Sequence, residues 1–179
     1  MALPEYCTLV VVNGRTCNAQ AHIQSPPAHL RPPLTSSTFT ATASQYGPAF
    51  FEWPNNQPVA TRQDYSYAVK AGPFPGATTV AAQPGDVLIL WGTGFGPTNP
   101  PPAAVPVPSD KAYATAAKPT VTINNNPVTV YGVALASGSV GLYQVAIQVP
   151  STLADGDWPI QATISGVSSP SGVVLSVHH

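Results

Sequence analysis

The sequence predicts an all-β fold, an immunoglobulin-like antiparallel β-sandwich. From Tyr143 to Val149, apolar residues alternate with polar or small ones, which is the period of a strand with one buried face. The same alternation returns from Trp158 to Ile164. Other short β-branched runs are separated by Gly, Pro and Asn turns, and no segment shows a helical period. We therefore expect two packed antiparallel sheets.

The composition of the 179-residue chain is unusual in two respects. Charged residues make up only 7%, and proline accounts for 22 residues, whereas ordinary domains have about 25% charged residues and about 5% proline. A net charge of −1 leaves no basic patch to neutralise phosphates, so we expect no nucleic-acid binding. No 18-residue apolar run predicts a membrane span. A weakly charged polar surface favours association with copies of the chain and an extracellular or cell-surface location.

Residues 1–45 form the first predicted segment, a partial β segment followed by a Pro-rich linker. The run Tyr6–Val12 ends in Asn13-Gly14, which predicts a hairpin continuing to Ala19. This hairpin has the pattern of a remnant of a preceding sandwich. Residues 22–37 are predicted to be an extended linker, and residues 37–43 return to strand chemistry. Met1–Tyr6 lacks the features of a signal peptide, so we interpret the chain as a piece of a longer protein.

Cys7 and Cys17 are the only cysteines. If Asn13-Gly14 makes a two-residue hairpin turn, Cys17 faces Val10, and Cys7 lies too far along the strand for a disulfide without rearrangement. Two separate thiols are one reading of the sequence. A bridge is the other, because export favours disulfides.

Residues 46–82 are predicted to be a β-hairpin and a connecting loop. The runs 49–53 and 57–62 flank Pro54-Asn55-Asn56, which has turn chemistry. Residues 66–82 carry Gly72-Pro73 and Pro75-Gly76, which indicate loop structure.

Residues 83–179 are the predicted sandwich itself. Gln83-Pro84-Gly85-Asp86 has the chemistry of a type II turn, and it precedes an apolar strand that ends at Trp91. The runs 120–123 and 128–131 are predicted to pair through Asn124–Asn126, whose residue types tolerate left-handed φ. The strands described first follow, joined by a turn at 153–157, and a last strand spans 173–177. Trp91 and Trp158 are expected in the core.

Several of these motifs together resemble a known family. They are 84–98 (PGDVLILWGTGFGPT), 119–123, 141–150 (GLYQVAIQVP), 155–157 (DGD) and 166–169, with 48–51 leading into them. The pattern is similar to the uncharacterised C-terminal domain of large secreted proteins of Solibacter and other acidobacteria, with good coverage from about 46 to 177. The resemblance implies an immunoglobulin-like sandwich, export and a position behind other domains. It implies no catalytic residues.

Gly92-Thr-Gly-Phe-Gly96 follows an apolar strand, but it does not predict a phosphate-binding loop. Such a loop needs a helix after it, and Pro97 and Pro100–Pro102 forbid one. We expect these glycines to serve turns or bulges. No triad or carboxylate pair is indicated, so we predict no enzyme and no cofactor.

Asp155 and Asp157 are the candidate metal ligands, since two carboxylates can serve calcium. The competing interpretation, a hydrogen-bonded turn, is preferred. Of the four histidines, two lie in the Pro-rich stretch and two, His178 and His179, end the chain. This placement does not predict a metal site.

Trp53, Tyr65, Tyr67 and Phe74 are the candidate ligand-binding residues. They lie in the less regular half of the chain, where a flat platform for stacking a sugar could form. Packing against one another is the alternative and is preferred.

The function predicted from these observations is a non-catalytic, exported structural, adhesive or assembly module at the C-terminal end of a larger bacterial protein. The expected partners are copies of the chain or neighbouring domains. The alternative is a carbohydrate-binding module with a polysaccharide as its partner.

Overall fold

The computed structural model describes residues 16–19, 22–23, 34–35, 39–42, 44–104 and 106–179. The chain divides into two compact units, residues 1–45 and residues 46–179. In the first unit, β1 (Thr16–Ala19) pairs antiparallel with β4 (Phe39–Thr42), and β2 (His22–Ile23) pairs with β3 (Leu34–Thr35). The predicted linker 22–37 therefore begins and ends in a short ladder. The first strand of the predicted hairpin, its Asn13-Gly14 turn and Cys7 lie outside the described residues.

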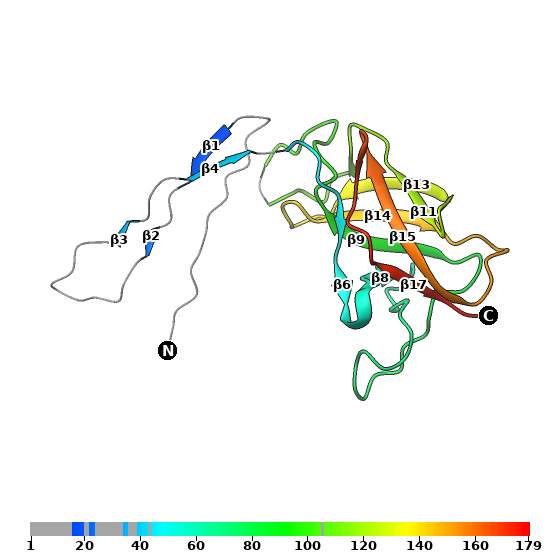
Figure 1. The fold of residues 1–179 in the computed structure, drawn as a ribbon. Helices are drawn as coiled ribbons and strands as arrows, with labels where there is room; N and C mark the ends of the chain where they lie inside the picture. Colours follow the sequence, from blue (N-terminus) through cyan, green and yellow to red (C-terminus); the bar gives the residue numbers. More distant parts are fainter. Residues whose placement is uncertain (1–15, 20–21, 24–33, 36–38, 43, 105) are drawn as a thin grey trace. The chain divides into compact units, whose positions relative to one another are not determined.

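The second unit contains one six-stranded antiparallel sheet, called here the first sheet. Its order is β10-β13-β14-β9-β5, and β8 also pairs with β9. Figure 1 shows β9 and β14 running through its middle. Its strands are β5 (Ala49–Phe50), β8 (Ala60–Thr61), β9 (Val87–Thr93), β10 (Tyr113–Ala114), β13 (Thr129–Leu135) and β14 (Tyr143–Gln148).

The second sheet is built around β15 (Gly156–Ile164), which crosses β9 and β14 in Figure 1. On one edge of β15 lies β11, followed by β12, and on the other edge β16 and β17 pair with successive parts of β15. These strands are β11 (Thr120–Ile123), β12 (Asn126–Pro127), β16 (Val167–Ser168) and β17 (Val174–Val177). All the ladders between these strands are antiparallel.

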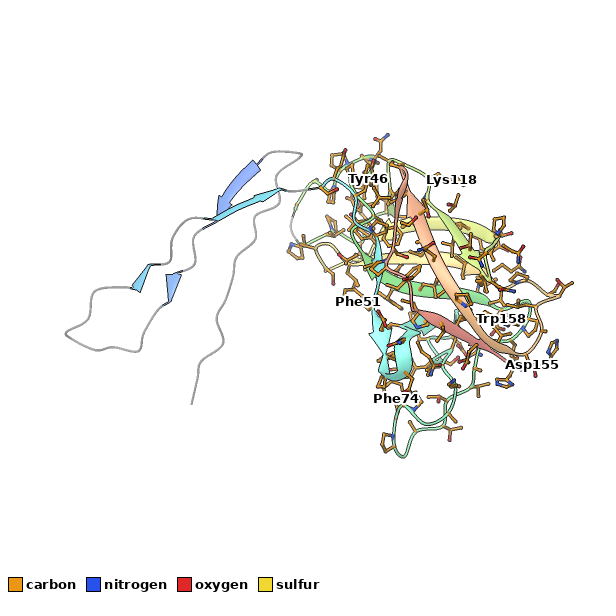
Figure 2. The ribbon with its side chains drawn as sticks, viewed as in Figure 1. Tyr46, Phe51, Phe74, Lys118, Asp155 and Trp158 are labelled. Carbon is orange, nitrogen blue, oxygen red and sulfur yellow. The ribbon has the colours of Figure 1, made fainter. Side chains whose placement is uncertain are left out.

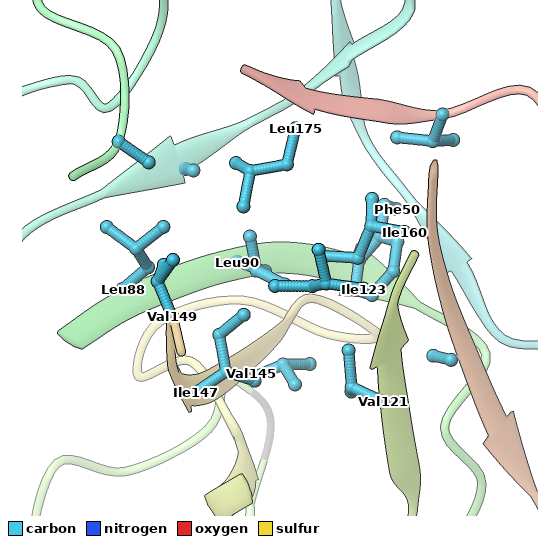
Figure 3. Close-up of a cluster of buried hydrophobic side chains, with 14 of the residues drawn as sticks. Phe50, Leu88, Leu90, Val121, Ile123, Val145, Ile147, Val149, Ile160 and Leu175 are labelled. Atoms are coloured by element: carbon cyan, nitrogen blue, oxygen red, sulfur yellow. The ribbon is translucent and has the colours of Figure 1, made fainter. Parts of the chain in front are cut away.

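The core lies between the two sheets, as the alternating patterns predicted (Figure 3). Val145 and Ile147 of β14 are fully buried, and so is Leu90 of β9. Val121 and Ile160 enter the same cluster from the second sheet. Burying each side chain of this size contributes about 1.5–3 kcal/mol to the free energy of unfolding. The two sheets share this apolar layer and so form an all-β sandwich.

Two predicted turns are confirmed by their backbone. Asp86 N donates to Gln83 O at 3.0 Å, and Gly85 has φ +88°, as a type II turn requires. Asn124 and Asn125 have φ +51° and +61° and join β11 to β12. The predicted pairing of 120–123 with 128–131 is wrong, because β13 pairs with β14 and β10 in the first sheet. Asn126 and Pro127 form the ladder with β11, and Val128 N adds one bond to Val121 O at 2.9 Å before the chain leaves for the first sheet.

Residues 46–82 belong to the sandwich unit rather than preceding it. The predicted hairpin is confirmed: β6 (Glu52–Trp53) pairs with β7 (Gln57–Pro58) across the 3-10 turn η1 (Pro54–Asn56). Its flanking strands β5 and β8 both pair with β9. Residues 66–82 were predicted to be loop. Ala68, Val69, Ala81 and Ala82 within them are nevertheless buried, and isolated bridges join Ala68 to Val80 and Ala82 to Val177.

The glycines after β9 allow a close approach of two chain segments. Gly94 has φ +75°, and a Cβ built on it would lie 1.9 Å from Gly47 O. Gly47 N donates to Gly94 O at 2.9 Å, so the two backbones are in direct contact. No helix in the described part of the chain is long and apolar enough to span a membrane.

Candidate functional site

Three of the four predicted ligand-binding aromatics come together beside the β6–β7 hairpin. The Trp53 ring lies 4.7 Å from the Phe74 ring at 88° and 5.5 Å from the Tyr67 ring at 58°, measured between centroids. Tyr67 and Phe74 are 6.0 Å apart. Tyr65 makes no ring contact with another described residue and is 78% exposed. Trp53 and Phe74 pack edge to face and the other two pairs are tilted, so the rings form a cluster rather than the flat platform expected.

Two buried N–H groups at this cluster have no hydrogen-bond partner. They are Trp53 Nε1 and Gln57 Nε2. Trp53 and Gln57 are direct partners in the β6–β7 ladder, so their side chains lie on the same face of the hairpin. Lys70 N donates to Gln57 Oε1 at 3.1 Å, which fixes the amide orientation. Sequence analysis missed Gln57, because a lone glutamine before Pro58 carries no pattern.

Arg62 holds the segment 66–82 against the sandwich. Its guanidinium donates to Asp86 Oδ2 at 3.0 Å, to Tyr67 O at 3.1 Å and to Ala81 O at 2.6 Å. A shallow depression beside it is lined by Arg62–Asp64 and Gly85–Val87. Because the donors of Arg62 are used in these contacts, its role here is structural.

Asp155 and Asp157 are held by separate partners. Asp155 contacts His178 and His179 at the end of the chain, and its hydrogen bond from His179 lowers its pKa. Asp157 lies in β15 rather than in the predicted turn, and it binds Lys70 and Ser176, which lower its pKa. No three metal-ligating side chains converge among the described residues. The two carboxylates therefore do not form a common site.

The outward face of the first sheet is a second candidate site. In the ladder registers, Ile89 of β9, Ala146 of β14 and Gly132 of β13 lie in one row across this face. The outward positions of these three strands carry no ionisable side chain apart from the weakly acidic phenol of Tyr131. They are Val87, Ile89, Trp91, Thr93, Thr129, Tyr131, Gly132, Ala134, Gln144, Ala146 and Gln148. We call these residues the outer face.

The outer face is unusual because one aromatic ring on it is fixed and exposed. Tyr131 is 59% exposed, and its hydroxyl donates to Gln148 Oε1 at 3.0 Å. Trp91 also faces outward and is half-buried, with Nε1 donating to Thr61 Oγ1 at 3.1 Å. The prediction that Trp91 lies in the core is therefore wrong. Trp158 is only half-buried as well, with Nε1 bound to Ala154 O, although its ring packs against the core cluster.

A face of this kind is suited to contact with another protein. The surfaces of soluble proteins normally carry charged side chains, which oppose association. Apolar surface that lacks them favours burial against a partner. Phe51, labelled in Figure 2, follows β5 and is 45% exposed. Its N–H donates to the carbonyl of Trp91, so it adds apolar surface at this edge of the outer face.

Comparison of the chain with family models, with curated proteins and with solved structures gives no match.

Proposed function

We propose that the chain is a non-catalytic, exported structural or adhesive module that assembles with copies of itself through the outer face. The immunoglobulin-like topology, the surface location and the relation to the acidobacterial domain family are parts of the same proposal. The observation that carries it is the outer face, where three neighbouring strands present apolar and amide side chains and no carboxylate, ammonium or guanidinium group.

A second copy of the chain is the partner that this face fits best. Two copies can meet here without burying an unpaired charge, which would cost several kcal/mol. The net charge of −1 adds little long-range repulsion. The side-chain amide of Gln144 offers both a donor and an acceptor, so identical faces can form hydrogen bonds with one another.

The area of the outer face sets the affinity that we expect for self-association. The outer face has three strands about 4.8 Å apart, and a seven-residue strand rises about 3.4 Å per residue, which gives a patch roughly 14 Å by 24 Å. That is about 340 Å² of projected area, less than half of the roughly 800 Å² per partner of a standard stable interface. We therefore expect a weak, concentration-dependent association in the micromolar range or above. Sedimentation velocity on the intact chain over a dilution series tests it.

Carbohydrate binding is the second candidate function, and the meeting of Trp53, Tyr67 and Phe74 favours it. Aromatic rings pack against the C–H faces of sugars, and tryptophan and tyrosine also offer polar groups. Retention of the chain on a polysaccharide column that depends on Trp53 separates this function from assembly.

A further inference from the structure

Two hydrogen-bond donors at the aromatic cluster are buried without an acceptor, which lowers the stability of the fold. A buried donor without an acceptor costs about 1–3 kcal/mol. Trp53 Nε1 and Gln57 Nε2 are both in that state, and Gln57 is 1% exposed. Both groups are donors, so what would satisfy them is an oxygen that accepts hydrogen bonds.

The segment that packs on Trp53 is attached mainly through one ring. Residues 71–78 are exposed except for the partly buried Pro73 and Phe74. The Phe74 ring packs at 88° on Trp53, and Ala77 N donates back to Phe74 O within the segment itself. Gly72 and Gly76 flank Phe74 with φ of +114° and +80°, where rotation costs glycine little.

Both ends of this segment are fixed to the sandwich. Lys70 binds Gln57 and Asp157 on one side, and on the other side Ala81 O accepts from Arg62. A segment with fixed ends, a single packed ring and glycines on both sides of that ring can move without unfolding the unit.

We propose that residues 71–78 are a lid, and that its opening lets a neutral sugar ring bind on Trp53. The C–H face of the sugar packs on the indole in place of Phe74, and its oxygens accept from Trp53 Nε1 and Gln57 Nε2. The ligand is uncharged because Lys70, the cationic group next to Gln57, is already paired with Asp157 at 2.5 Å. This inference rests on the carbohydrate-binding candidate function and not on assembly.

The test uses the intact chain in native gels that contain hydroxyethylcellulose, arabinoxylan, galactomannan or, as an acidic comparison, polygalacturonate. We expect retardation by at least one neutral polymer and none by polygalacturonate. Trp53→Phe keeps a ring but removes the donor, and it should weaken binding at least tenfold. Phe74→Ala removes the covering ring and should leave binding equal or stronger. Val140→Ala, at an apolar residue that is 70% exposed between β13 and β14, is the control and should change nothing.

A second measurement uses the unaltered chain, so it does not depend on whether the variants fold. The Trp53 indole N–H signal in a ¹⁵N–¹H spectrum should shift on addition of the retarding polymer, while the signals of Trp91 and Trp158 stay in place. Equal loss of binding in Trp53→Phe and Phe74→Ala would overturn the lid, since Phe74 would then be a contact residue. Binding that does not need Trp53 would overturn this site but leave carbohydrate binding standing. No retardation by any polymer would overturn both.

Discussion

The Tyr131 hydroxyl donates to Gln148 Oε1 at 3.0 Å, and this bond links two neighbouring strands across the outer face. Tyr131 lies where the β13–β14 register shifts between Val130 and Gly132, so it is the extra residue of a β-bulge. The bulge makes the ring project, and the bond to Gln148 holds it in place. An aromatic ring that is both exposed and fixed loses little entropy when a partner covers it.

Ile147→Asp should unfold the sandwich unit. Ile147 is fully buried in the core cluster, so the substitution places a carboxylate there with no partner. We expect a loss of at least about 4 kcal/mol of unfolding free energy. Circular dichroism during thermal melting measures it, and an unchanged melting temperature would contradict the assignment of β14 to the core.

Gly94→Ala should destabilise the unit far more than Gly138→Ala. Both glycines have nearly the same positive φ, +75° and +77°, so the backbone cost of about 1 kcal/mol is common to the two variants. At Gly94 the new Cβ also meets Gly47 O, whereas nothing lies within 4 Å at Gly138. We expect losses of about 3 and about 1 kcal/mol in urea unfolding. Equal losses would show that the contact between 47 and 94 is absent.

Asp157→Asn should lower stability at neutral pH but not in acid. Hydrogen bonds from Lys70 and Ser176 hold the pKa of Asp157 below its ordinary value of 3.8. A carboxyl whose pKa is lowered by folding contributes stability above its unfolded pKa and loses it as pH falls through the folded pKa. The pair is exposed, so we expect a loss of about 0.5–1 kcal/mol at pH 7. Melting curves of the two proteins should converge as the pH falls through the folded pKa of Asp157, which lies below 3.8; a constant difference would contradict the ion pair.

Removal of divalent cations should leave the melting temperature unchanged. Asp155 is engaged by the terminal histidines and Asp157 by Lys70, so neither carboxylate is directed at a common ion. Thermal melting with EDTA and then with added calcium provides the measurement. A ligand that binds only the native state raises its stability by mass action, so a calcium-dependent rise would reveal a site.

The local signals in the sequence were sufficient for much of the fold. The alternation at 143–149 and 160–164 predicted which side chains are buried, and the Pro84-Gly85 and Asn124-Asn125 turns followed from the φ values that these residue types adopt. The change of sheet between β12 and β13 was not predictable in this way, because it depends on pairing with β14, which lies farther along the chain.

The candidate sites were harder to predict than the fold, because they are formed by residues far apart in the sequence. The sequence placed Trp53, Tyr67 and Phe74 in one region, but the angles at which the rings pack follow from how residues 66–82 return to the β6–β7 hairpin. The face to which Trp91 points follows from its neighbour Leu90, which pairs with Val145 in the core. The outer face is formed by strands that are up to sixty residues apart in the sequence, and no local pattern joins them.

Sedimentation velocity of the intact chain, compared with Gln144→Glu and Thr120→Glu, tests the assembly proposal most directly. Gln144→Glu places a carboxylate on β14 in the outer face, and Thr120→Glu adds the same charge on the exposed side of the second sheet. We expect the unaltered chain and Thr120→Glu to associate as concentration rises. Gln144→Glu should raise the dissociation constant at least tenfold, because association would bury its charge. A monomer at every concentration, or equal association of all three proteins, would contradict assembly through the outer face.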